Sequence, residues 1–460
     1  MMHTSDYIAK YKSRFIEELM AFLRIPSIST MPEHKQDIKQ AANFIKDQLV
    51  AAGADKAWII ETTGHPLVYG EKIIDRQLPT VLVYGHYDVQ PAEPYELWNS
   101  KPFEPLIKGD KIFARGAADD KGQFYIHVKA LETMIATQSL PCNIKFLIEG
   151  EEEMGSGSLT NFLEDSANHN LLQADAILVS DTTIISMDQP SLTTGLRGIV
   201  YLEVTLTGAN RDLHSGVYGG AVANPINILC KMLAALHDEN GHITIPGFYD
   251  EVPDLTVAER AELNSIPFDL EAYKQTLGIN EVIGEKGYTT LERVGIRPSL
   301  DVNGIWGGYI GTGAKTVLPS QAHAKVSMRL APNQDAQKVM NAFVSYFSSL
   351  APKGTQVAIK PYHGGCNAVV LDKNSLAFRA AENAFETVWG KHPFTTREGG
   401  SIPIIAKFKE KLGTDAVLMG FGLDTDAIHS PNEHFSLIAF FKGISTVIKF
   451  YENLAALYKK

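Results

Sequence analysis

The sequence predicts an α/β protein of two domains, with the second domain inserted into the first. The chain has 460 residues, more than one ordinary hydrophobic core accommodates, so two domains are expected. Four short, nearly continuous apolar runs are typical of strands buried on both faces of an α/β sheet. Between about residues 195 and 362 apolar and polar positions alternate instead, which favours strands with one exposed face.

The first element expected is a helix that starts after Thr4 or Ser5 and ends before Pro26. Its apolar residues recur at spacings of three and four, from Ile8 to Phe22, and so form one face. Buried strands are then expected at residues 80–84, 143–148, 176–179 and 416–419. Further helices are expected at residues 123–137, 375–389 and 435–458.

The inserted stretch is interpreted as β-α-β-β-α-β, the order of a split βαβ sandwich. Strands are expected at residues 199–206, 322–330 and 357–362, and helices at residues 225–239 and 334–350. Residues 245–297 form a Pro/Gly-rich excursion with weak structure signals. The expected boundaries are therefore 1–194 for the first part of the catalytic domain, 195–365 for the insert and 366–460 for the second part.

Composition excludes several function classes. A net charge of −11 argues against a nucleic-acid or anionic-membrane surface. No apolar run approaches the roughly 20 residues that span a bilayer, and the N-terminus lacks the pattern of a signal peptide. The three cysteines are scattered and form no CxxC pair, which favours a reduced, cytoplasmic compartment.

Metal-binding side chains gather in five short segments, most of them at the carboxyl ends of expected strands or in adjoining loops. Ligands of open α/β sheets gather at this edge. Two imidazoles and three carboxylates can bind two divalent ions, and a spare Glu can move a proton. The sequence therefore predicts a metal site built from residues 85–88, 115–122, 149–156, 180–181 and 427–430.

The first two segments each have a plainer interpretation. His86 is a candidate ligand, and Asp88, two residues on, can accept its second ring N–H. The alternative is a loop His beside a loop Asp. Asp119 and Asp120 are adjacent carboxylates that repel each other, so burying both requires a cation. Because a carboxylate has two oxygens, one of them could bridge two metal ions. The alternative is an acidic pair at a helix N-terminus, stabilised by the macrodipole.

The acidic run Glu149, Glu151, Glu152 and Glu153 ends an apolar strand and leads into a tight turn. One acid could bind metal while its neighbour takes a proton from water. A solvated charge run is the alternative, and the pattern alone does not choose the ligand. Two further candidates are Asp181, at a strand end, and His429, in a polar loop. Alone, these are more often a turn residue and a solvated His.

Together these segments resemble the M20 metallopeptidase family, which includes dipeptidases, carnosinases, desuccinylases and aminoacylases. The likeness spans nearly the whole chain, and the cytosolic nonspecific dipeptidase and carnosinase-like branch fits best. The motifs that carry it are Gly-His-Tyr-Asp-Val-Gln-Pro (85–91), Arg-Gly-Ala-Ala-Asp-Asp-Lys-Gly (115–122), Gly-Ala-Lys-Thr-Val-Leu-Pro (313–319) and Arg-Glu-Gly-Gly-Ser-Ile-Pro (397–403).

The resemblance implies two metal ions per subunit, with Asp119 bridging them. One ion would be held by His86, Asp119 and Asp181, and the other by Asp119, Glu153 and His429. Glu152 resembles the general base and Asp88 the residue that orients the first His. Because Glu151 makes the family's Glu-Glu pair a triple, a shift of one residue would exchange ligand and base.

The resemblance also implies a fold: a mixed-sheet α/β/α, phosphorylase/hydrolase-like catalytic domain with an inserted α+β ferredoxin-like lid and dimerisation domain. Arg329 would bind the substrate carboxylate, as bidentate guanidinium recognition allows. The remaining substrate-binding residues implied are His214 from the partner subunit at the oxyanion, His363, Gly400 and Ser401. Without the resemblance they are a strand Arg, loop His residues and a Gly-rich turn.

The function expected is hydrolysis of the peptide bond of dipeptides or other very short peptides by a two-metal-activated water, in a cytoplasmic homodimer. Zn²⁺ is the most expected metal, with Mn²⁺ or Co²⁺ as alternatives. The rival is an N-acyl-amino-acid amidohydrolase or deacylase with the same site. A non-catalytic binding protein is disfavoured because every expected position is filled. A serine hydrolase is disfavoured because Ser401 lacks a Gly-x-Ser-x-Gly elbow.

Overall fold

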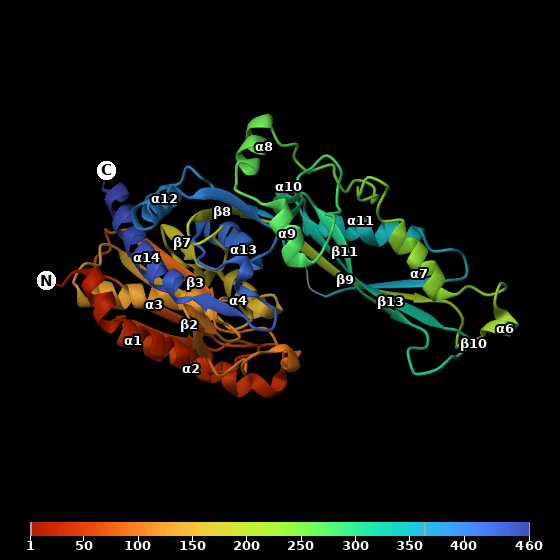
Figure 1. Cartoon of the computed structure of the whole chain (residues 1–460), viewed down its shortest axis with the longest axis horizontal. Coiled ribbons are helices and arrows are strands. Elements are labelled where there is room, and N and C mark those ends of the chain that lie inside the picture. Colours follow the sequence, from red (N-terminus) through yellow and green to blue (C-terminus); the bar gives the residue numbers. More distant parts are fainter. Residues whose placement is uncertain (1, 363–364, 460) are drawn as a thin grey trace. The chain divides into compact units, whose positions relative to one another are not determined.

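The computed structural model describes residues 2–362 and 365–459 (Figure 1). The chain folds into two compact units. Unit 1 contains residues 1–194, 371–396 and 404–460, and unit 2 contains residues 195–370 and 397–403. Residues 366–370 and 397–403, which the sequence assigned to the end of the catalytic domain, thus belong to unit 2.

The sheet of unit 1 runs in the order β1-β2-β6-β3-β7-β17-β8, and β16 also pairs with β8. Its four central strands are parallel, and they are the four buried strands that the sequence predicts. The bounds are β1 Lys56–Ile60, β2 Leu67–Lys72, β3 Thr80–His86, β6 Asn143–Glu149, β7 Ala176–Val179, β8 Ser191–Leu196, β16 Phe394–Glu398 and β17 Ala416–Leu418.

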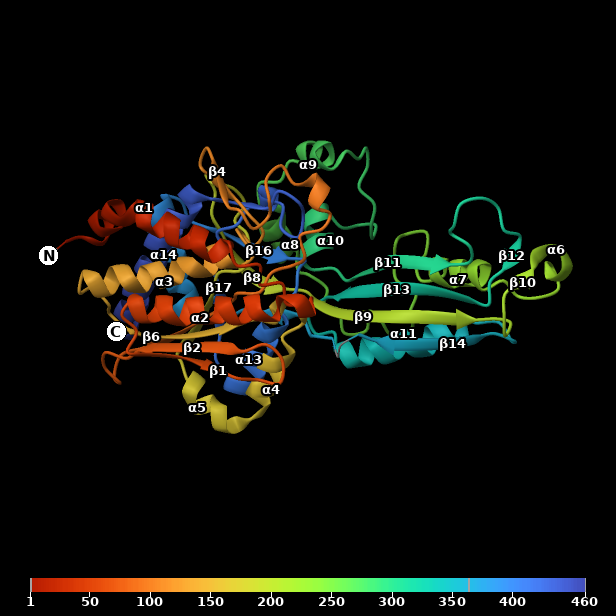
Figure 2. The same cartoon turned by 90° about the horizontal axis from the view of Figure 1, so that it is seen from below.

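Helices cover both faces of this sheet, which makes unit 1 an α/β/α sandwich (Figure 2). One face packs against α1 Thr4–Leu23, α2 Lys35–Ala51, α3 Lys121–Ala136, α12 Leu376–Trp389 and α14 Leu437–Tyr458. The opposite face meets α4 Gly157–Glu164, α5 His169–Leu172 and α13 Pro403–Leu412. Successive side chains of β3 point to opposite faces of the sheet. Val81 and Val83 pack in the core with the first group of helices, whereas Tyr84 contacts Phe408 of α13 edge-on at the other face.

The last helix begins two residues later than the sequence predicts, because residues before it form a short ribbon. Strand β18 (His434–Ser436) pairs with β5 (Lys111–Phe113), which pairs with β4 (Leu106–Lys108). Ser436 then caps α14 by accepting the N–H of Ala439 at 3.3 Å. This ribbon ties the segment before α14 to the segment before α3, and both segments carry predicted ligands.

Unit 2 contains an antiparallel sheet in the order β11-β13-β9-β14, backed by two helices. The bounds are β9 Gly198–Thr207, α7 Pro225–Ala234, β11 Ser299–Gly307, β13 Gln321–Leu330, α11 Ala336–Ser349 and β14 Gln356–Pro361. The order along the chain is the predicted β-α-β-β-α-β, but the sequence pattern does not locate the strand that forms β11. Its side chains are mostly exposed, so it has no apolar run that would mark it as a strand.

Unit 2 also contains a helix shorter than predicted and several short helices and strands that the sequence does not predict. Helix α7 ends at Ala234, five residues early, because the Asp238 side chain accepts the N–H groups of Asn240 and His242 and forms a turn. The excursion before β11 contains α8 Val257–Asn264, α9 Leu270–Leu277 and α10 Thr290–Gly295, and the tip of the unit contains β10 Leu213–His214, α6 Ser215–Tyr218 and β12 Val317–Leu318.

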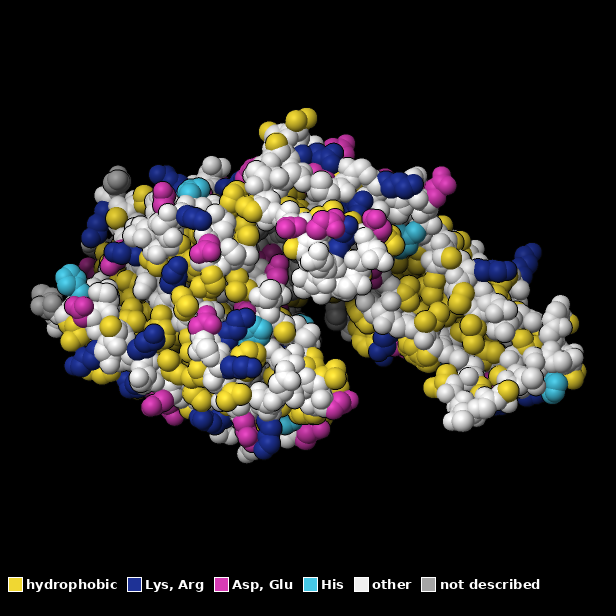
Figure 3. Space-filling view, viewed as in Figure 1, with side chains coloured by type: hydrophobic (Ala, Val, Ile, Leu, Met, Phe, Trp, Pro, Cys, Tyr) yellow, Lys and Arg dark blue, Asp and Glu magenta, His cyan; other side chains and the backbone are white. Residues whose placement is uncertain are grey.

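Hydrophobic side chains gather on the surface over the strands of unit 2 (Figure 3). Strand β11, at one edge of the sheet, and the loop after it expose Val302, Ile305, Trp306, Tyr309 and Ile310. Among the described helices of the chain, none combines the length and hydropathy needed to cross a bilayer.

Candidate metal centre

The predicted ligands lie at the carboxyl edge of the parallel strands of unit 1. His86 is the last residue of β3, and Asp181 follows the end of β7 by two residues. Asp119 lies in the loop before α3, Glu153 in a short 3₁₀ turn after β6, and His429 in the loop before β18. Parallel strands bring their carboxyl ends to one edge, so segments far apart in sequence converge here.

Asp119 faces two histidines with its two carboxylate oxygens. Its Oδ1 lies 3.1 Å from Nε2 of His86, and its Oδ2 lies 2.8 Å from Nε2 of His429. Asp181 Oδ2 is 3.9 Å from the same nitrogen of His86, and Glu153 Oε2 is 3.3 Å from that of His429. The described residues thus form two groups that share Asp119: His86, Asp119 and Asp181, and Asp119, Glu153 and His429.

These residues fit a pair of divalent ions in donor chemistry and in spacing. Within each group the ligand atoms lie within 4.8 Å of one another. Ligands bound tetrahedrally at about 2.0–2.1 Å are separated by about 3.3 Å, which is close to the contacts observed. Oε1 of Glu153 and Oδ1 of Asp120 are buried and have no hydrogen-bond partner among the residues that the structure describes, as expected of acids arranged around a cation.

The protein alone stabilises this concentration of acids poorly. Burial, followed by repulsion from Asp120, raises the pKa of Asp181 well above its usual value. Burial likewise raises the pKa of Glu152, and repulsion from Glu153 adds to the effect. Burial lowers the pKa of His429, but hydrogen bonds to Asp119 and Glu153 outweigh it and raise that pKa to about 11. Bound cations would offset this repulsion between carboxylates.

Asp88 orients more than one part of the centre. His86 lies with Nδ1 3.0 Å from the backbone oxygen of Asp88 and 3.4 Å from its Oδ1, which leaves Nε2 facing Asp119 and Asp181. The Asp88 carboxylate also accepts the backbone N–H groups of Glu152 at 3.2 Å and Glu153 at 3.1 Å. The buried Asp88 thus contacts His86 and the backbone of both Glu152 and Glu153, and so fixes their positions.

The structure distinguishes the three glutamates of the run. Glu151 is buried and turns away from the centre: its Oε1 accepts the N–H of His65 at 2.6 Å and its Oε2 that of Ser158 at 2.7 Å. Glu153 contacts His429. Glu152 lies between them in sequence and is affected by the charges of His86 and Asp181. The one-residue shift that the sequence allowed is therefore disfavoured.

The two neighbouring aspartates also differ. Asp120 Oδ2 accepts the backbone N–H of His86 at 3.3 Å and contacts neither imidazole ring, so the bridging arrangement belongs to Asp119. The peptide bond between them is cis.

Three further side chains contact the predicted ligands or the segments that carry them, although no sequence pattern pointed to them. Gln90, which belongs to the motif at residues 85–91, donates from Nε2 to Oε2 of Glu153 at 2.8 Å. His127 is buried and contacts Oγ of Ser180 at 2.8 Å, one residue before Asp181. Glu433 accepts four hydrogen bonds beneath the Asp119 loop. No local pattern in the sequence marks these three residues, because the partner of each lies in a distant segment of the chain.

Four of the predicted substrate-contact residues lie in unit 2. Arg329, on β13, donates from Nη1 to Oγ of Ser401 at 3.0 Å, and Ser401 in turn donates to the backbone oxygen of Arg197. Gly400 is exposed. His214, on β10, is exposed, and its Nδ1 accepts the N–H of Gly216 at 3.0 Å. The fifth predicted contact, His363, lies outside the described residues.

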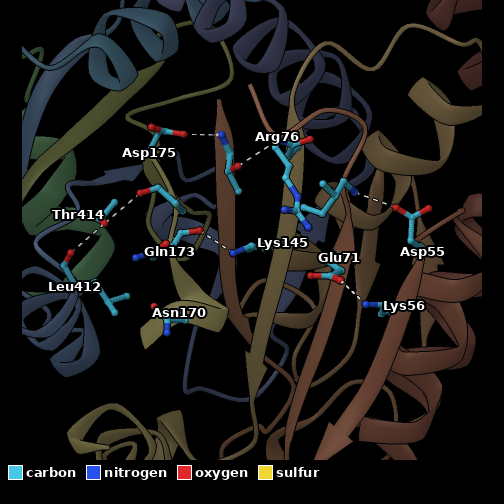
Figure 4. A pocket seen from close by; sticks show the side chains of 14 residues that line it. Asp55, Lys56, Glu71, Arg76, Lys145, Asn170, Gln173, Asp175, Leu412 and Thr414 are labelled. Carbon is cyan, nitrogen blue, oxygen red and sulfur yellow. Dashed lines mark hydrogen bonds and ion pairs between the residues drawn. The ribbon is translucent and has the colours of Figure 1, made fainter. Parts of the chain in front are cut away.

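A cavity of about 870 Å³ lies at the opposite, amino edge of the parallel strands (Figure 4). Thr80 and Asn143, the first residues of β3 and β6, help to line it. Two of its lysines have protein partners: Lys145 donates to the backbone oxygens of Leu171 and Gln173, each at 2.8 Å, and Lys56 lies 3.4 Å from Glu71. No predicted ligand lines it.

Comparisons with known proteins agree with the fold. The sequence model of Peptidase family M20/M25/M40 matches residues 82–453. The Cys-Gly metallodipeptidase DUG1 of Candida albicans is 33% identical over 96% of this chain and 95% of its own length. The Beta-Ala-His dipeptidase of Homo sapiens is 30% identical over 98% of this chain and 92% of its own. The solved structure of an M20 family metallo-carboxypeptidase from Sulfolobus solfataricus is 33% identical, with a TM-score of 0.86, covering 96% of this chain and 99% of that one.

Proposed function

This chain belongs to peptidase family M20/M25/M40, and we propose that it is a metal-dependent dipeptidase. Its reaction is hydrolysis of the peptide bond of dipeptides or other very short peptides. The observation that carries the proposal is the position of Asp119, whose two oxygens face His86 and His429. A carboxylate placed in this way serves a pair of ions better than a single one.

The chain's own residues would divide the chemistry between them. When bound, two divalent ions supply Lewis acidity and lower the pKa of water. An oxygen of Glu152 takes the proton of the attacking water and returns it to the leaving amine nitrogen. Burial raises the pKa of Glu152 above its usual value, which suits a base that later acts as an acid. Asp88 holds the backbone of Glu152 in place.

A short peptide with a free C-terminal carboxylate is the substrate class that unit 2 favours. Arg329 has no carboxylate within ion-pair distance among the described residues, and its contact with Ser401 fixes one side of the guanidinium. We assign Arg329 to the substrate carboxylate, with Ser401 and Gly400 beside it. A dipeptide presents this carboxylate one residue from the bond that is cleaved, as does the C-terminus of a carboxypeptidase substrate.

A homodimer in which His214 of the partner subunit stabilises the oxyanion completes the proposal. The exposed position of His214 supports this arrangement, because its ring is open to a second chain. The edge strand β11, which exposes Val302, Ile305 and Trp306, supports pairing between copies, since an exposed edge is a template for a further strand. Zn²⁺ is the proposed metal, because the site mixes nitrogen and oxygen donors, with Mn²⁺ or Co²⁺ as substitutes.

A cytoplasmic location is proposed from the cysteines. Cys142, Cys230 and Cys366 form no disulfide bond within the described part of the chain, and Cys230 is exposed. A reducing compartment keeps cysteines from being oxidised to disulfides.

The test of this function is a panel of dipeptides, tripeptides, longer peptides and N-acyl amino acids, each assayed with Zn²⁺, Mn²⁺ and Co²⁺. Dipeptides should have the highest kcat/KM with at least one metal. Preference for N-acyl amino acids would identify a deacylase instead. Progressive shortening of long peptides would identify a carboxypeptidase.

Replacing Arg329 with Lys should raise KM for dipeptides by about 10- to 100-fold, because a planar two-point contact becomes a point charge. The matched substrate is the same dipeptide with a C-terminal amide, which lacks the carboxylate. Its kcat/KM should change less than about threefold in the variant. Equal losses on both substrates would contradict carboxylate recognition by Arg329.

A mixture of His214→Ala and Glu152→Ala subunits should regain activity that neither variant has alone. Random pairing makes half of the dimers hybrids, and each hybrid has one intact site of two, so about one quarter of wild-type activity is expected. Co-expression with different tags allows the hybrid to be purified, and the purified hybrid should have about one half of wild-type activity. An inactive hybrid would remove His214 from the partner's site.

A further inference from the structure

Glu433 is a buried carboxylate that holds the loop carrying the bridging ligand. Its side chain is 0% exposed. Oε1 accepts the backbone N–H groups of Ala118 at 2.9 Å and Asp119 at 3.1 Å. Oε2 accepts the N–H of Gly116 and Nη1 of Arg115, both at 2.8 Å. These four donors use the acceptor positions that an ionised carboxylate offers.

The effect of these contacts is to fix the direction of the Asp119 side chain. The loop from Arg115 to Asp119 turns sharply at Gly116, which has a φ of +83°. Three of its backbone N–H groups point toward Glu433, while the two oxygens of Asp119 point toward His86 and His429. An isolated loop of this kind would sample several conformations, and the buried carboxylate selects one of them.

Glu433 also connects this loop to the other ligand segment. It follows His429 by four residues, and its backbone oxygen accepts the N–H of Ala114 at 3.1 Å. The pairing continues in the ribbon of β18 and β5, where His434 lies opposite Phe113. Beside it, Asn432 donates to the backbone oxygen of Leu97 at 2.9 Å. One residue therefore sets the spacing between Asp119 and His429, two ligands of the same group.

We infer that Glu433 is a positioning residue of the metal centre: it contacts no predicted ligand atom, but it holds Asp119 and His429 at the separation that an ion requires. The inference rests on the proposed function, since it presupposes that the centre binds metal. Partners that orient ligands in this way typically contribute about 10- to 100-fold to metal affinity.

The experiment is titration of Zn²⁺ into apoprotein in competition with a fluorescent chelator. Glu433→Gln should lower Zn²⁺ affinity by about 10- to 100-fold. The variant amide removes the charge that balances Arg115 and turns an NH₂ group toward backbone N–H donors. Dipeptide hydrolysis should recover as Zn²⁺ is raised, with KM within about twofold of wild type at saturating metal, because Glu433 does not contact substrate.

Glu292 in unit 2 offers a matched control. It is also 0% exposed, and it accepts hydrogen bonds from Arg260, Asn264 and the backbone of Thr289. Glu292→Gln should leave Zn²⁺ affinity within about twofold of wild type, although it too removes a buried charge. Equal weakening in both variants would attribute the effect to general destabilisation and overturn the inference.

Hydrogen exchange on the wild-type protein tests the same point without a substitution, in case Glu433→Gln does not fold. The amides of Gly116, Ala118 and Asp119 should be protected in apoprotein, because the carboxylate and not the metal orders this loop. Rapid exchange without Zn²⁺ and protection with it would overturn the inference. Wild-type protein that binds none of Zn²⁺, Mn²⁺ and Co²⁺ would reject both the function and the inference, whereas unchanged affinity in folded Glu433→Gln rejects the inference alone.

Discussion

Replacing Glu152 with Gln is expected to lower kcat by about 10²- to 10⁴-fold, while the protein still binds two metal ions. The amide has nearly the shape of the carboxylate but can neither take a proton from water nor deliver one to the amine. Because Glu152 belongs to neither ligand group, metal content should be unchanged. Metal analysis of the purified variant and steady-state kinetics on one dipeptide measure the two quantities.

Glu151→Gln is the matched control for this prediction. Glu151 is buried one residue away, and its carboxylate accepts the N–H groups of His65 and Ser158 instead of facing the ligands. Its loss should cost about 1–3 kcal/mol of stability, as expected for buried hydrogen bonds, with kcat reduced less than about tenfold. If Glu151→Gln proved the more severe on kcat, or if Glu152→Gln retained near wild-type turnover, the base would have been assigned to the wrong glutamate.

Removal of metal is expected to lower kcat/KM by about 10³-fold or more, since several kcal/mol of transition-state stabilisation is lost. Dialysis against a chelator followed by addition of Zn²⁺, Mn²⁺ or Co²⁺ should abolish and restore turnover. Asp119→Asn should resemble the chelated enzyme even in excess metal, because this residue belongs to both groups. His429→Asn is the comparison, since it belongs to one group only and should retain one ion. Full activity in chelator would reject the metal centre.

The same experiment has a stability readout that depends on pH. In apoprotein the pKa values of Asp181, Glu152, His86 and His429 all lie above their usual values. The folded state then binds more protons than the unfolded state, so the free energy of unfolding should decrease as pH rises above about 4. His127, whose pKa burial lowers to about 3, offsets part of this slope below about pH 6.5, and Lys121, whose pKa burial lowers to about 7, offsets part of it above about pH 7.

Bound metal should remove the pH dependence that comes from the ligands. It should also raise the unfolding free energy by about 2.7 kcal/mol at a metal concentration one hundred times Kd. Thermal melts of apoprotein and Zn²⁺-loaded protein between about pH 6 and pH 8 measure the difference. Apoprotein that gained stability on going to pH 8 would contradict the assignment of a crowded acidic centre.

Much of this architecture could be predicted from local patterns. The four apolar runs became β3, β6, β7 and β17, because strands buried on both faces need near-continuous apolar residues. The family assignment from the motifs is confirmed by the match to Peptidase family M20/M25/M40. The exposed strand β11 could not be located in the same way, since edge position and solvent exposure remove the apolar pattern.

By itself, the sequence determined the chemistry of the centre: two imidazoles and three carboxylates, each following a strand or preceding a helix. Their residue types and the parallel sheet were enough to predict that they meet at one edge. Only the tertiary structure decided how neighbours of equal chemistry divide their roles. The carboxylates of Glu151 and Asp120 accept backbone N–H groups, whereas those of Glu153 and Asp119 contact imidazole rings. The reason is physical: identical carboxylates acquire different surroundings from partners that lie far away in the chain. Glu433, for example, accepts the backbone N–H of Asp119 across more than 300 residues of sequence.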